Sequence, residues 1–391
     1  MRTVPIADLL VLQRAGYWGE DAGTSEIDVP VIRNGDVLDS GDIQWKHLPT
    51  RGFREDDAEK ARVMSGDVVL TVSGNCGYAA YVATEPITTT CASNFVRVLR
   101  FDATQASSHY VFHFMHRAQF RASLAPFIRG TTMKNLAVAN ALAQVRIPLP
   151  SIREQCRIVE VLDEAEALRA ERRASLVQLD LLTQSIFLDM FGGPTAVLSR
   201  WPVRQLGQLL DFMTSGSRGW AEYYAESGDL FIRIQNVQRD ELVLDDITHV
   251  DAPHSAEAER TRVQAGDVLL SITADLGRTA VVPEGLGAAF INQHLSILRT
   301  RALVPRFLSA YLTSPAGQRQ VLGRNRQGVK AGLNFDDIRA LTVPIPPHEL
   351  QCEFARRVAA VEKLKTTHRA SMDELDTLFA SLQNRAFRGE L

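Results

Sequence analysis

The chain has 391 residues, with 43 Lys and Arg against 46 Asp and Glu, and 45% of it is hydrophobic. This composition excludes a disordered chain and predicts two or three folded domains. The four cysteines form no CxxC pair, and neither a signal peptide nor an apolar run of about 18 residues is present. We therefore expect a cytoplasmic protein without a membrane segment or a zinc ribbon.

The first half predicts a mixed domain followed by a long helix. Short apolar runs at 29–33, 67–72 and 95–99 are typical of strands, and residues 110–123 are typical of a helix. Pro148 and Pro150 end this part, and about 40 residues without Pro or Gly follow. Their content of Ala, Leu, Glu and Arg predicts one long helix.

The second half repeats this plan. Gly66–Leu70 returns as Gly266–Leu270, and Gln155-Cys156 returns as Gln351-Cys352, 196 positions later. These ordered matches indicate an internal duplication. The equivalent strands are predicted at 230–234, 267–272 and 295–298, with a helix at 306–322 and a second long helix after Pro346 and Pro347.

Both long helices carry an apolar stripe with 4,3 spacing, which is the coiled-coil period of 3.5. We expect the two helices to pair with each other; the alternative is that each packs on its own domain. Their cationic middle positions would repel unless they face solvent or acidic groups of a partner, so the centre of the pair is a candidate docking site. The predicted interface consists of Ile158, Leu162, Arg169, Arg172, Leu176, Leu179, Ile186, Phe354, Val358, Val361, Lys365, His368, Leu375, Phe379 and Leu382.

Two basic segments occupy equivalent places in this near-neutral chain. Residues 97–146 hold seven basic residues and one acidic residue, and residues 297–339 hold eight and two, whereas 1–96 and 200–296 are acidic. Basic clusters are the electrostatic mark of phosphate binding. Nucleic acid is therefore favoured over a merely solvated basic surface.

Candidate DNA contacts lie in three kinds of loop. Gly-containing polar loops end both basic segments, aromatic residues flank glycines early in each half, and Asn, Gln and Arg at strand ends can read base edges. The alternatives are core packing for the aromatic residues and turn hydrogen bonds for the polar ones. The predicted DNA-binding residues are Tyr17, Trp18, Arg33, Asn75, Asn94, Arg129, Thr131, Thr132, Lys134, Asn135, Arg218, Trp220, Tyr223, Arg233, Gln293, Arg324, Arg326, Gln327, Lys330 and Asn334.

The sequence lacks the motifs of common catalytic and cofactor sites. It contains no GxGxxG, HExxH or GxSxG, and neither polar loop matches the ATP-binding GxxxxGK[ST]. His109, His113 and His116 have helical spacing, but their repeat equivalents near Arg306 cannot bind metal, so a helix surface is the preferred interpretation. We therefore predict a binding protein without a catalytic residue, cofactor or metal of its own.

Residues 147–159, IPLPSIREQCRIV, resemble the P-L-P-x-x-E-Q-x-x-I-V segment of type I restriction–modification specificity subunits. Residues 182–192 are similar to the end of that conserved region, and residues 382–391 are similar to the family's usual C-terminal segment. The second copy departs from the pattern, because His348-Glu349-Leu350-Gln351 lacks the Glu-Gln pair. The resemblance covers the whole chain in its order of domains and helices.

The resemblance implies an α+β protein with a pseudo-twofold repeat. Two similar α/β target recognition domains, residues 1–147 and 194–343, would alternate with helical spacers at 148–193 and 344–391 that form an antiparallel coiled coil. Each recognition domain would read one half of a bipartite, asymmetric site in double-stranded DNA. The spacers would recruit two methyltransferase subunits, which use S-adenosylmethionine. Two restriction/translocase subunits, which use ATP and Mg, are optional further partners.

Two alternatives stay open at this point. One is a specificity subunit of a related combined restriction–methylation enzyme, which uses the same recognition logic with a fused partner. The other is a non-catalytic coiled-coil scaffold whose basic segments bind acidic proteins. A phosphate-binding protein shows a steep dependence of affinity on salt, whereas the scaffold would show a shallow one.

Overall fold

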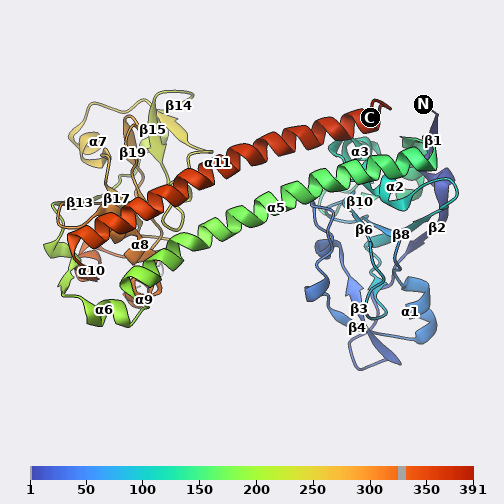
Figure 1. Cartoon of the computed structure of the whole chain (residues 1–391), viewed down its shortest axis with the longest axis horizontal. Helices are drawn as coiled ribbons and strands as arrows, with labels where there is room; N and C mark the ends of the chain where they lie inside the picture. The colour runs from blue at the N-terminus through green and yellow to red at the C-terminus, as the bar shows by residue number, and fades with distance from the viewer. Residues whose placement is uncertain (1, 325–331) are drawn as a thin grey trace. The chain divides into compact units, whose positions relative to one another are not determined.

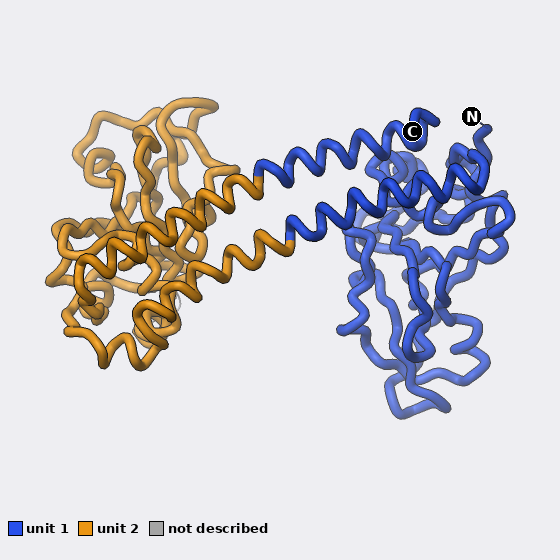
Figure 2. The backbone as a smooth tube through the Cα atoms, viewed as in Figure 1, with its two compact units in different colours: residues 1–173, 370–391 blue, residues 174–369 orange. Residues whose placement is uncertain are grey.

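The computed structural model describes residues 2–324 and 332–391 (Figure 1). Its chain divides into two compact units, each of which is described by itself. Unit 1 contains residues 1–173 and 370–391, and unit 2 contains residues 174–369 (Figure 2). Each unit therefore combines one globular part with about half of each long helix, α5 (Ile152–Phe191) and α11 (His348–Ala386).

An antiparallel four-stranded sheet forms the core of unit 1. Its order is β2 (Leu10–Ala15), β8 (Val96–Phe101), β5 (Val68–Thr71) and β6 (Ala79–Tyr81). A second sheet contains β4 (Thr50–Phe53), β3 (Ile27–Ile32) and β7 (Cys91–Ala92). The remaining elements are the strand pairs β1 (Thr3–Pro5) with β11 (Arg146–Pro148) and β9 (Ile128–Arg129) with β10 (Asn135–Leu136), and the helices α1 (Glu55–Ala61), α2 (Ser108–Met115), α3 (Ala118–Ser123) and α4 (Val138–Gln144).

Unit 2 repeats this topology. Its first sheet has the order β13 (Phe212–Ser215), β20 (Leu295–Arg299), β17 (Val268–Ser271) and β18 (Thr279–Val281). The second sheet contains β14 (Tyr224–Ala225), β16 (Thr248–Val250), β15 (Asp229–Ile232) and β19 (Ala289–Ile291). The other elements are β12 (Val203–Gln205) with β21 (Thr342–Pro344), and the helices α6 (Ala196–Arg200), α7 (Ala256–Thr261), α8 (Pro305–Thr313), α9 (Pro315–Gly323) and α10 (Phe335–Arg339).

The repeated Gly-Asp segment forms the same buried ion pair in both units. Asp67 accepts two hydrogen bonds from Arg100 at 2.7 and 2.9 Å, and Asp267 accepts two from Arg299 at 2.6 and 2.7 Å. The preceding Gly66 has a φ of 87°, a backbone conformation that strongly favours glycine. The segment thus has the same role in both halves: it makes a turn and supplies a buried carboxylate, which the arginine of the neighbouring strand neutralises.

The repeated Gln-Cys segment joins each long helix to its recognition domain. The buried Gln155 side chain accepts a hydrogen bond from the backbone N–H of Ser107 at 2.8 Å and donates one to the Pro150 carbonyl at 3.0 Å. Gln351 makes the equivalent bonds to Val304 and Pro346, both at 2.9 Å. This glutamine fixes the start of the spacer helix against the N-terminus of α2 or α8.

Two helices predicted as single elements are each divided. The helix predicted at 110–123 is broken between α2 and α3, and the one at 306–322 is broken between α8 and α9. In unit 2 the break has a clear cause: the Ser314 side chain accepts a hydrogen bond from the Gly317 N–H, and Pro315 takes the first helical position. The apolar periodicity continues across both breaks, so it did not reveal them.

The stripe predicted along the long helices is buried within each unit. In unit 1, Ile158 and Leu162 of α5 share a hydrophobic core with Phe379 and Ala386 of α11. In unit 2, the Phe354 ring of α11 lies 5.7 and 5.5 Å from the rings of Phe187 and Phe191 of α5. The halves of the two helices run antiparallel side by side in both units, which confirms the predicted antiparallel pairing (Figure 1).

One stretch of the chain, residues 152–200, is long and apolar enough to span a membrane by length and composition alone. A single such helix is weak evidence, since core helices of soluble proteins pass the same test. The second half of α5 exposes the apolar side chains of Val177, Leu181, Leu182 and Leu188. Leu182 is considered below as part of a protein-binding surface.

Candidate nucleic-acid interface

Polar loops of unit 1 that the sequence singled out separately lie together. The turn after β5 contacts the loop between β9 and β10: the Ser73 hydroxyl donates to the Asn135 side chain, and the Gly74 N–H donates to the Lys134 carbonyl at 2.9 Å. Gly74 also lies against Asn34, because a Cβ at this glycine would be 3.1 Å from the Asn34 amide nitrogen. Three loops from distant parts of the sequence thus form one polar cluster.

Unit 2 brings the same loops together with different side chains. The turn after β17 pairs with the segment before α10, since Thr273 forms a β-bridge with Gly332 and the Leu333 N–H donates to the Ile272 carbonyl at 2.9 Å. Thr273 also contacts His294 through a hydrogen bond of 2.5 Å. A hollow in this part of the unit is lined by Arg239, Asp275 and Arg278.

Matching backbone hydrogen bonds establish which loop positions are equivalent. The Val72 N–H donates to the Phe95 carbonyl, and the Ile272 N–H donates to the His294 carbonyl, both at 2.9 Å. Asn94 and Gln293, which precede these residues, therefore occupy equivalent positions, as the sequence predicted. The exposed Phe95 and its equivalent His294 were not among the predicted DNA contacts. A single aromatic residue before a strand carries no recognisable signal for such a role.

Several predicted contact residues have exposed side chains. They comprise Tyr17, Asn75, Asn94, Arg129, Thr131, Thr132, Lys134, Asn135 and Arg218. Tyr17 packs edge-on against Phe53, and the partly buried Trp18 lies under the Arg51 guanidinium. These residues stay predicted DNA contacts, and Arg326, Gln327 and Lys330 lie outside the described residues.

Other predicted contact residues have structural roles. Trp220 is 6% exposed and stacks on Phe231 with ring centroids 5.0 Å apart, so the interpretation of its ring as an exposed contact is wrong. Tyr223, half-buried, packs edge-on against Trp220. The Arg324 side chain donates to the Ala340 carbonyl at 2.7 Å, and Asn334 caps α10 by accepting from the Asp337 N–H at 2.8 Å.

The two arginines at equivalent strand ends are held by acidic neighbours. Arg33 makes an ion pair of 2.9 Å with Asp36, and the hydrogen bonds that the guanidinium donates to this carboxylate raise the pKa of the guanidinium. Arg233 lies 3.5 Å from Asp246. The Arg33 side chain remains half exposed, so one edge of the guanidinium is available while the ion pair fixes its direction.

The charge of the basic segments is largely neutralised inside the units. Arg100, Arg121, Arg299 and Arg306 form ion pairs with aspartates, while Arg117 stacks over Phe114 and Phe387. Within the described part of the chain, Arg129 and Lys134 of the first segment have exposed side chains without a recorded ion pair. Phosphate binding would therefore depend on a few loop residues rather than on whole helices.

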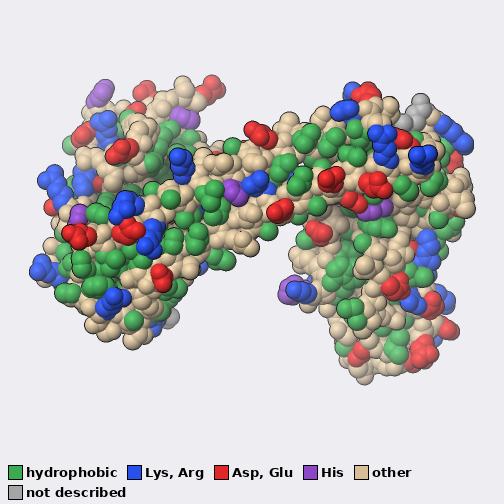
Figure 3. All heavy atoms as spheres, viewed as in Figure 1, with side chains coloured by type: hydrophobic (Ala, Val, Ile, Leu, Met, Phe, Trp, Pro, Cys, Tyr) green, Lys and Arg blue, Asp and Glu red, His purple; other side chains and the backbone are tan. Residues whose placement is uncertain are grey.

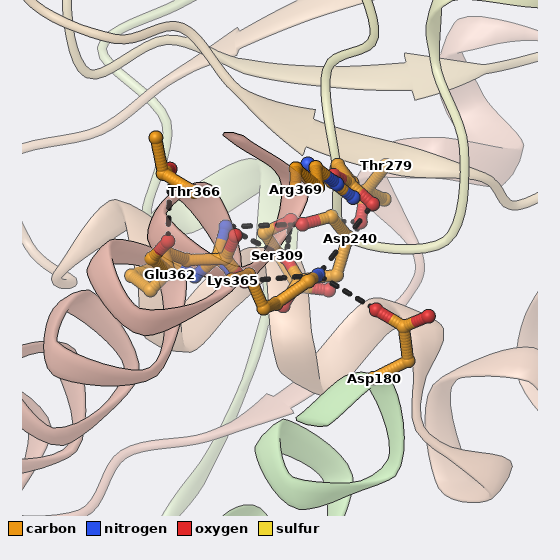
Figure 4. Close-up of polar contacts among 10 residues, drawn as sticks. Asp180, Asp240, Thr279, Ser309, Glu362, Lys365, Thr366 and Arg369 are labelled. Carbon is orange, nitrogen blue, oxygen red and sulfur yellow. Dashed lines mark hydrogen bonds and ion pairs between the residues drawn. The ribbon is translucent and has the colours of Figure 1, made fainter. Parts of the chain in front are cut away.

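An interhelical ion pair lies at equivalent positions near the middle of the helix pair in both units. In unit 1, Arg169 of α5 lies 2.6 Å from Asp376 of α11 and stacks over Phe379. In unit 2, Lys365 of α11 lies 2.9 Å from Asp180 of α5 (Figure 4). Arg169 and Lys365 are related by the 196-residue offset, and so are Asp180 and Asp376. Because each cation is paired with an aspartate of the opposing helix, it does not need an acidic group of a partner protein.

The seam residues around these ion pairs are buried or half-buried. Leu179 is buried, and the remaining middle positions are only partly covered: Arg172, Leu176, Ile186, His368, Leu375 and Leu382. Val358 and Val361 are buried in unit 2. The predicted interface is therefore an interface between the two helices themselves, and any subunit interface must use other faces.

His109 and His113 of α2, together with the C-cap residue His116, do not form the exposed helix surface that the sequence predicted. His113 is 3% exposed, and the His109 and His113 rings stack with centroids 5.0 Å apart. Both imidazoles contact Asp163 of α5. The sequence did not reveal this cluster, because Asp163 is 50 positions from His113 and belongs to another element.

Comparison with known proteins assigns these repeated features to one family. The family model described as type I restriction modification DNA specificity domain matches residues 2–178 and 199–376. The EcoBI and EcoKI type I restriction enzyme specificity subunits of Escherichia coli are 23% and 24% identical to the chain, over 67% and 85% of its length. These matches cover 61% and 76% of the two relatives.

Solved structures share the fold over nearly the whole chain. One is a chain from a structural study of complex assembly and conformational transition of the type I R-M system, with a TM-score of 0.59, 20% identity and coverage of 100% and 98% of the two chains. Another is the S subunit of a type I restriction–modification system from M. genitalium, with a TM-score of 0.57, 14% identity and coverage of 99% and 96%. The chain belongs to the type I restriction modification DNA specificity family and carries one copy of the family's domain in each half.

Proposed function

We propose that the chain is the component of a type I restriction–modification complex that selects the DNA sequence, with each unit reading one half of a bipartite site in double-stranded DNA. The duplicated loop cluster carries this proposal. In both units the turn after β5 or β17 pairs with the polar loop that ends the basic segment. In unit 1 exposed Asn, Arg, Lys and Thr side chains of these loops can donate hydrogen bonds to phosphates and base edges.

The proposed DNA site is asymmetric because equivalent loop positions carry different side chains. Asn75, Asn94 and Phe95 in unit 1 correspond to Asp275, Gln293 and His294 in unit 2. The Asp275 carboxylate can only accept hydrogen bonds, whereas the Asn75 amide can also donate them, so the two clusters suit different bases. The chain supplies no catalytic group in this proposal: its methyltransferase partners use S-adenosylmethionine, and restriction subunits, where present, use ATP and Mg in the cytoplasm.

Exchange of one recognition domain tests this function. We expect that replacing residues 203–344, from β12 to β21, with the equivalent segment of another family member changes one half of the methylated motif and leaves the other half and the gap unchanged. The exchange keeps the strand pairing that closes the domain. The motif is measured by single-molecule sequencing of adenine methylation in cells that carry each version.

A change in both halves of the motif would contradict the assignment of one half-site to each unit. The matched control replaces the gene segment for residues 203–344 with synonymous codons, so that the protein is unchanged. This control must leave the motif intact. In a binding assay, a steep fall in affinity with salt separates a DNA reader from a scaffold for acidic proteins.

We further propose that four exposed leucines on the spacer helices bind two copies of one partner, the methyltransferase subunit. The side chains of Leu168, Leu182, Leu364 and Leu378 are 40% to 51% exposed. On each helix the two leucines are 14 positions apart, which is two heptads, so they lie on the same face. Figure 3 shows apolar side chains exposed along both helices.

The 196-residue offset relates Leu168 to Leu364 and Leu182 to Leu378. Unit 1 contains Leu168 beside Arg169 and Leu378 beside Phe379, and Arg169 stacks on Phe379 across the helix pair. Unit 2 contains the equivalent Leu182 and Leu364. Each unit thus offers one apolar position from each helix, which suits two copies of the same subunit bound at equivalent places.

Aspartate substitutions test this surface one unit at a time. Leu168→Asp with Leu378→Asp should remove one methyltransferase copy, because a buried charge costs at least about tenfold in affinity at an apolar interface. Leu182→Asp with Leu364→Asp should remove the other copy, and all four changes should remove both. Native mass spectrometry of the complex gives the number of copies.

The matched control is Val177→Asp, which places the same charge at an exposed apolar position on another face of α5. This variant should retain both copies. Retention of two copies by the fourfold leucine variant would contradict the proposed docking surface without affecting the assignment of DNA recognition to the loops.

A further inference from the structure

Two histidines and one aspartate converge where α2 of the recognition domain meets α5 in unit 1. His109 and His113 are one helical turn apart on α2, so both rings project from the same face. Their Nε2 atoms lie 3.1 and 2.8 Å from the same oxygen, Oδ1 of Asp163. The possible ligand atoms of the three side chains all lie within 4.8 Å of one another.

We propose that His109, His113 and Asp163 bind one divalent transition-metal ion, with zinc as the best match. Two imidazole nitrogens and one carboxylate oxygen are a common zinc ligand set, and a water molecule completes a tetrahedral site of this kind. Metal–ligand bonds of about 2.0–2.2 Å place tetrahedral ligand atoms about 3.3 Å apart. The two Nε2–Oδ1 distances are a few tenths of an ångström shorter than this, and the ligand atoms of the whole cluster lie within 4.8 Å of one another, so small side-chain adjustments would admit the ion.

The burial of the three side chains suits a site with one open position. His113 is buried, whereas His109 is partly exposed and the Asp163 side chain is 44% exposed. The exposed side provides a path for the ion and a place for a water ligand. Tyr81 stacks on the His109 ring at 4.3 Å between centroids, which helps to hold that imidazole in its direction toward Asp163.

The repeat gives an independent reason for a cation at this place. In unit 2 the equivalent junction joins α8 to α11 through Arg306, whose guanidinium lies 3.4 Å from Glu362 and 3.6 Å from Asp240. A permanent positive charge therefore links the recognition domain to the spacer helix there. In unit 1 the recorded ion-pair contacts of Asp163 within the described residues are both with imidazoles.

A divalent ion would give unit 1 the charged link that Arg306 gives unit 2. The neighbouring Glu166 is already used, since it pairs with Arg169 and Arg173. The ion would thus hold α2 against α5 and would fix the recognition domain to its end of the helix pair. This role is structural and adds no catalytic step to the proposed function.

Metal content of the full chain tests the proposal. The protein is stripped with a chelator, dialysed against a slight excess of Zn²⁺ or Co²⁺ and freed of unbound ion. We expect one ion per chain by elemental mass spectrometry, and visible absorption typical of tetrahedral Co²⁺. Asp163→Asn and His113→Ala should each weaken binding at least tenfold.

Asp163→Asn is the decisive variant, because it preserves the shape of a partly exposed side chain and should leave the fold intact by circular dichroism. The matched control is His348→Ala with Cys352→Ser, a second pair of adjacent metal-binding side chains with Sγ 3.5 Å from Nδ1. The control should retain one ion. Absence of bound ion in the wild-type chain, or equal binding by Asp163→Asn, would overturn the proposal.

Discussion

Replacing Lys365 with Ala is expected to lower the free energy of unfolding of unit 2 by about 3–5 kcal/mol. Lys365 is 4% exposed, and its ammonium lies 2.9 Å from Asp180 and 3.5 Å from Glu362 (Figure 4). Glu241 lies 3.7 Å from the same ammonium. Loss of the side chain would leave a cavity and would remove the cation shared by Asp180, Glu362 and Glu241, although Arg306 and Arg369 still pair with Glu362 and Glu241. The cost is large for this reason, although many exposed ion pairs contribute little.

The protonation of Lys365 sets the pH range of this effect. Burial by itself lowers the pKa of the ammonium, but the Asp180 hydrogen bond and the charges of Glu362 and Glu241 outweigh it and raise the pKa above the ordinary 10.5. A raised pKa in the folded state stabilises the fold below the unfolded value, and the contribution is lost only as the pH rises through the folded pKa. The difference between wild type and Lys365→Ala should therefore be constant from pH 7 to 9.

Amide hydrogen exchange measures the free energy of opening separately for each unit. Slowly exchanging amides in residues 348–369 should lose protection in Lys365→Ala. Lys363→Ala is the matched control, since Lys363 is an exposed lysine two positions away, and its effect should stay within about 0.5 kcal/mol. Equal effects of the two substitutions would mean that the buried ion pairs do not stabilise the unit.

The repeat and the helix pairing were predictable because they depend on local periodicity. The 4,3 spacing through Ile158, Leu162 and Phe354 requires a facing apolar surface, and the equivalent stripe on the other helix provides it. The partners of the central cations were not predicted. Asp180 and Asp376 lie next to the stripe rather than in it, so their role becomes visible only when the two helices are placed antiparallel.

The loop residues show where sequence reasoning fails. Tyr17 and Trp220 both follow glycine-containing turns, yet Tyr17 is exposed and Trp220 is in the core between Phe231 and Phe290. The difference depends on β15 and β19, whose positions are set by long-range strand pairing. The charge of Arg100 or Arg299 likewise suggested a basic surface until the buried aspartate of the other strand was placed beside it.

Replacing Phe354 with Ala is expected to destabilise unit 2 by about 3–5 kcal/mol, because truncation of a buried aromatic ring removes its contacts and leaves a cavity. Phe354 is fully buried, and its ring contacts Phe187 and Phe191 of α5, while Phe191 also packs on Phe307 of α8. This side chain therefore joins both spacer helices and the recognition domain.

Two results would separate this role from general helix stability. Leu364→Ala removes an exposed apolar side chain from the same helix and should change the free energy of unfolding by less than about 1 kcal/mol. Phe354→Leu retains much of the buried volume and should recover part of the loss. If Phe354→Ala leaves the amides of residues 174–191 as protected as in the wild type, the aromatic cluster does not hold α5 in unit 2, and the pairing must depend on the Lys365–Asp180 ion pair instead.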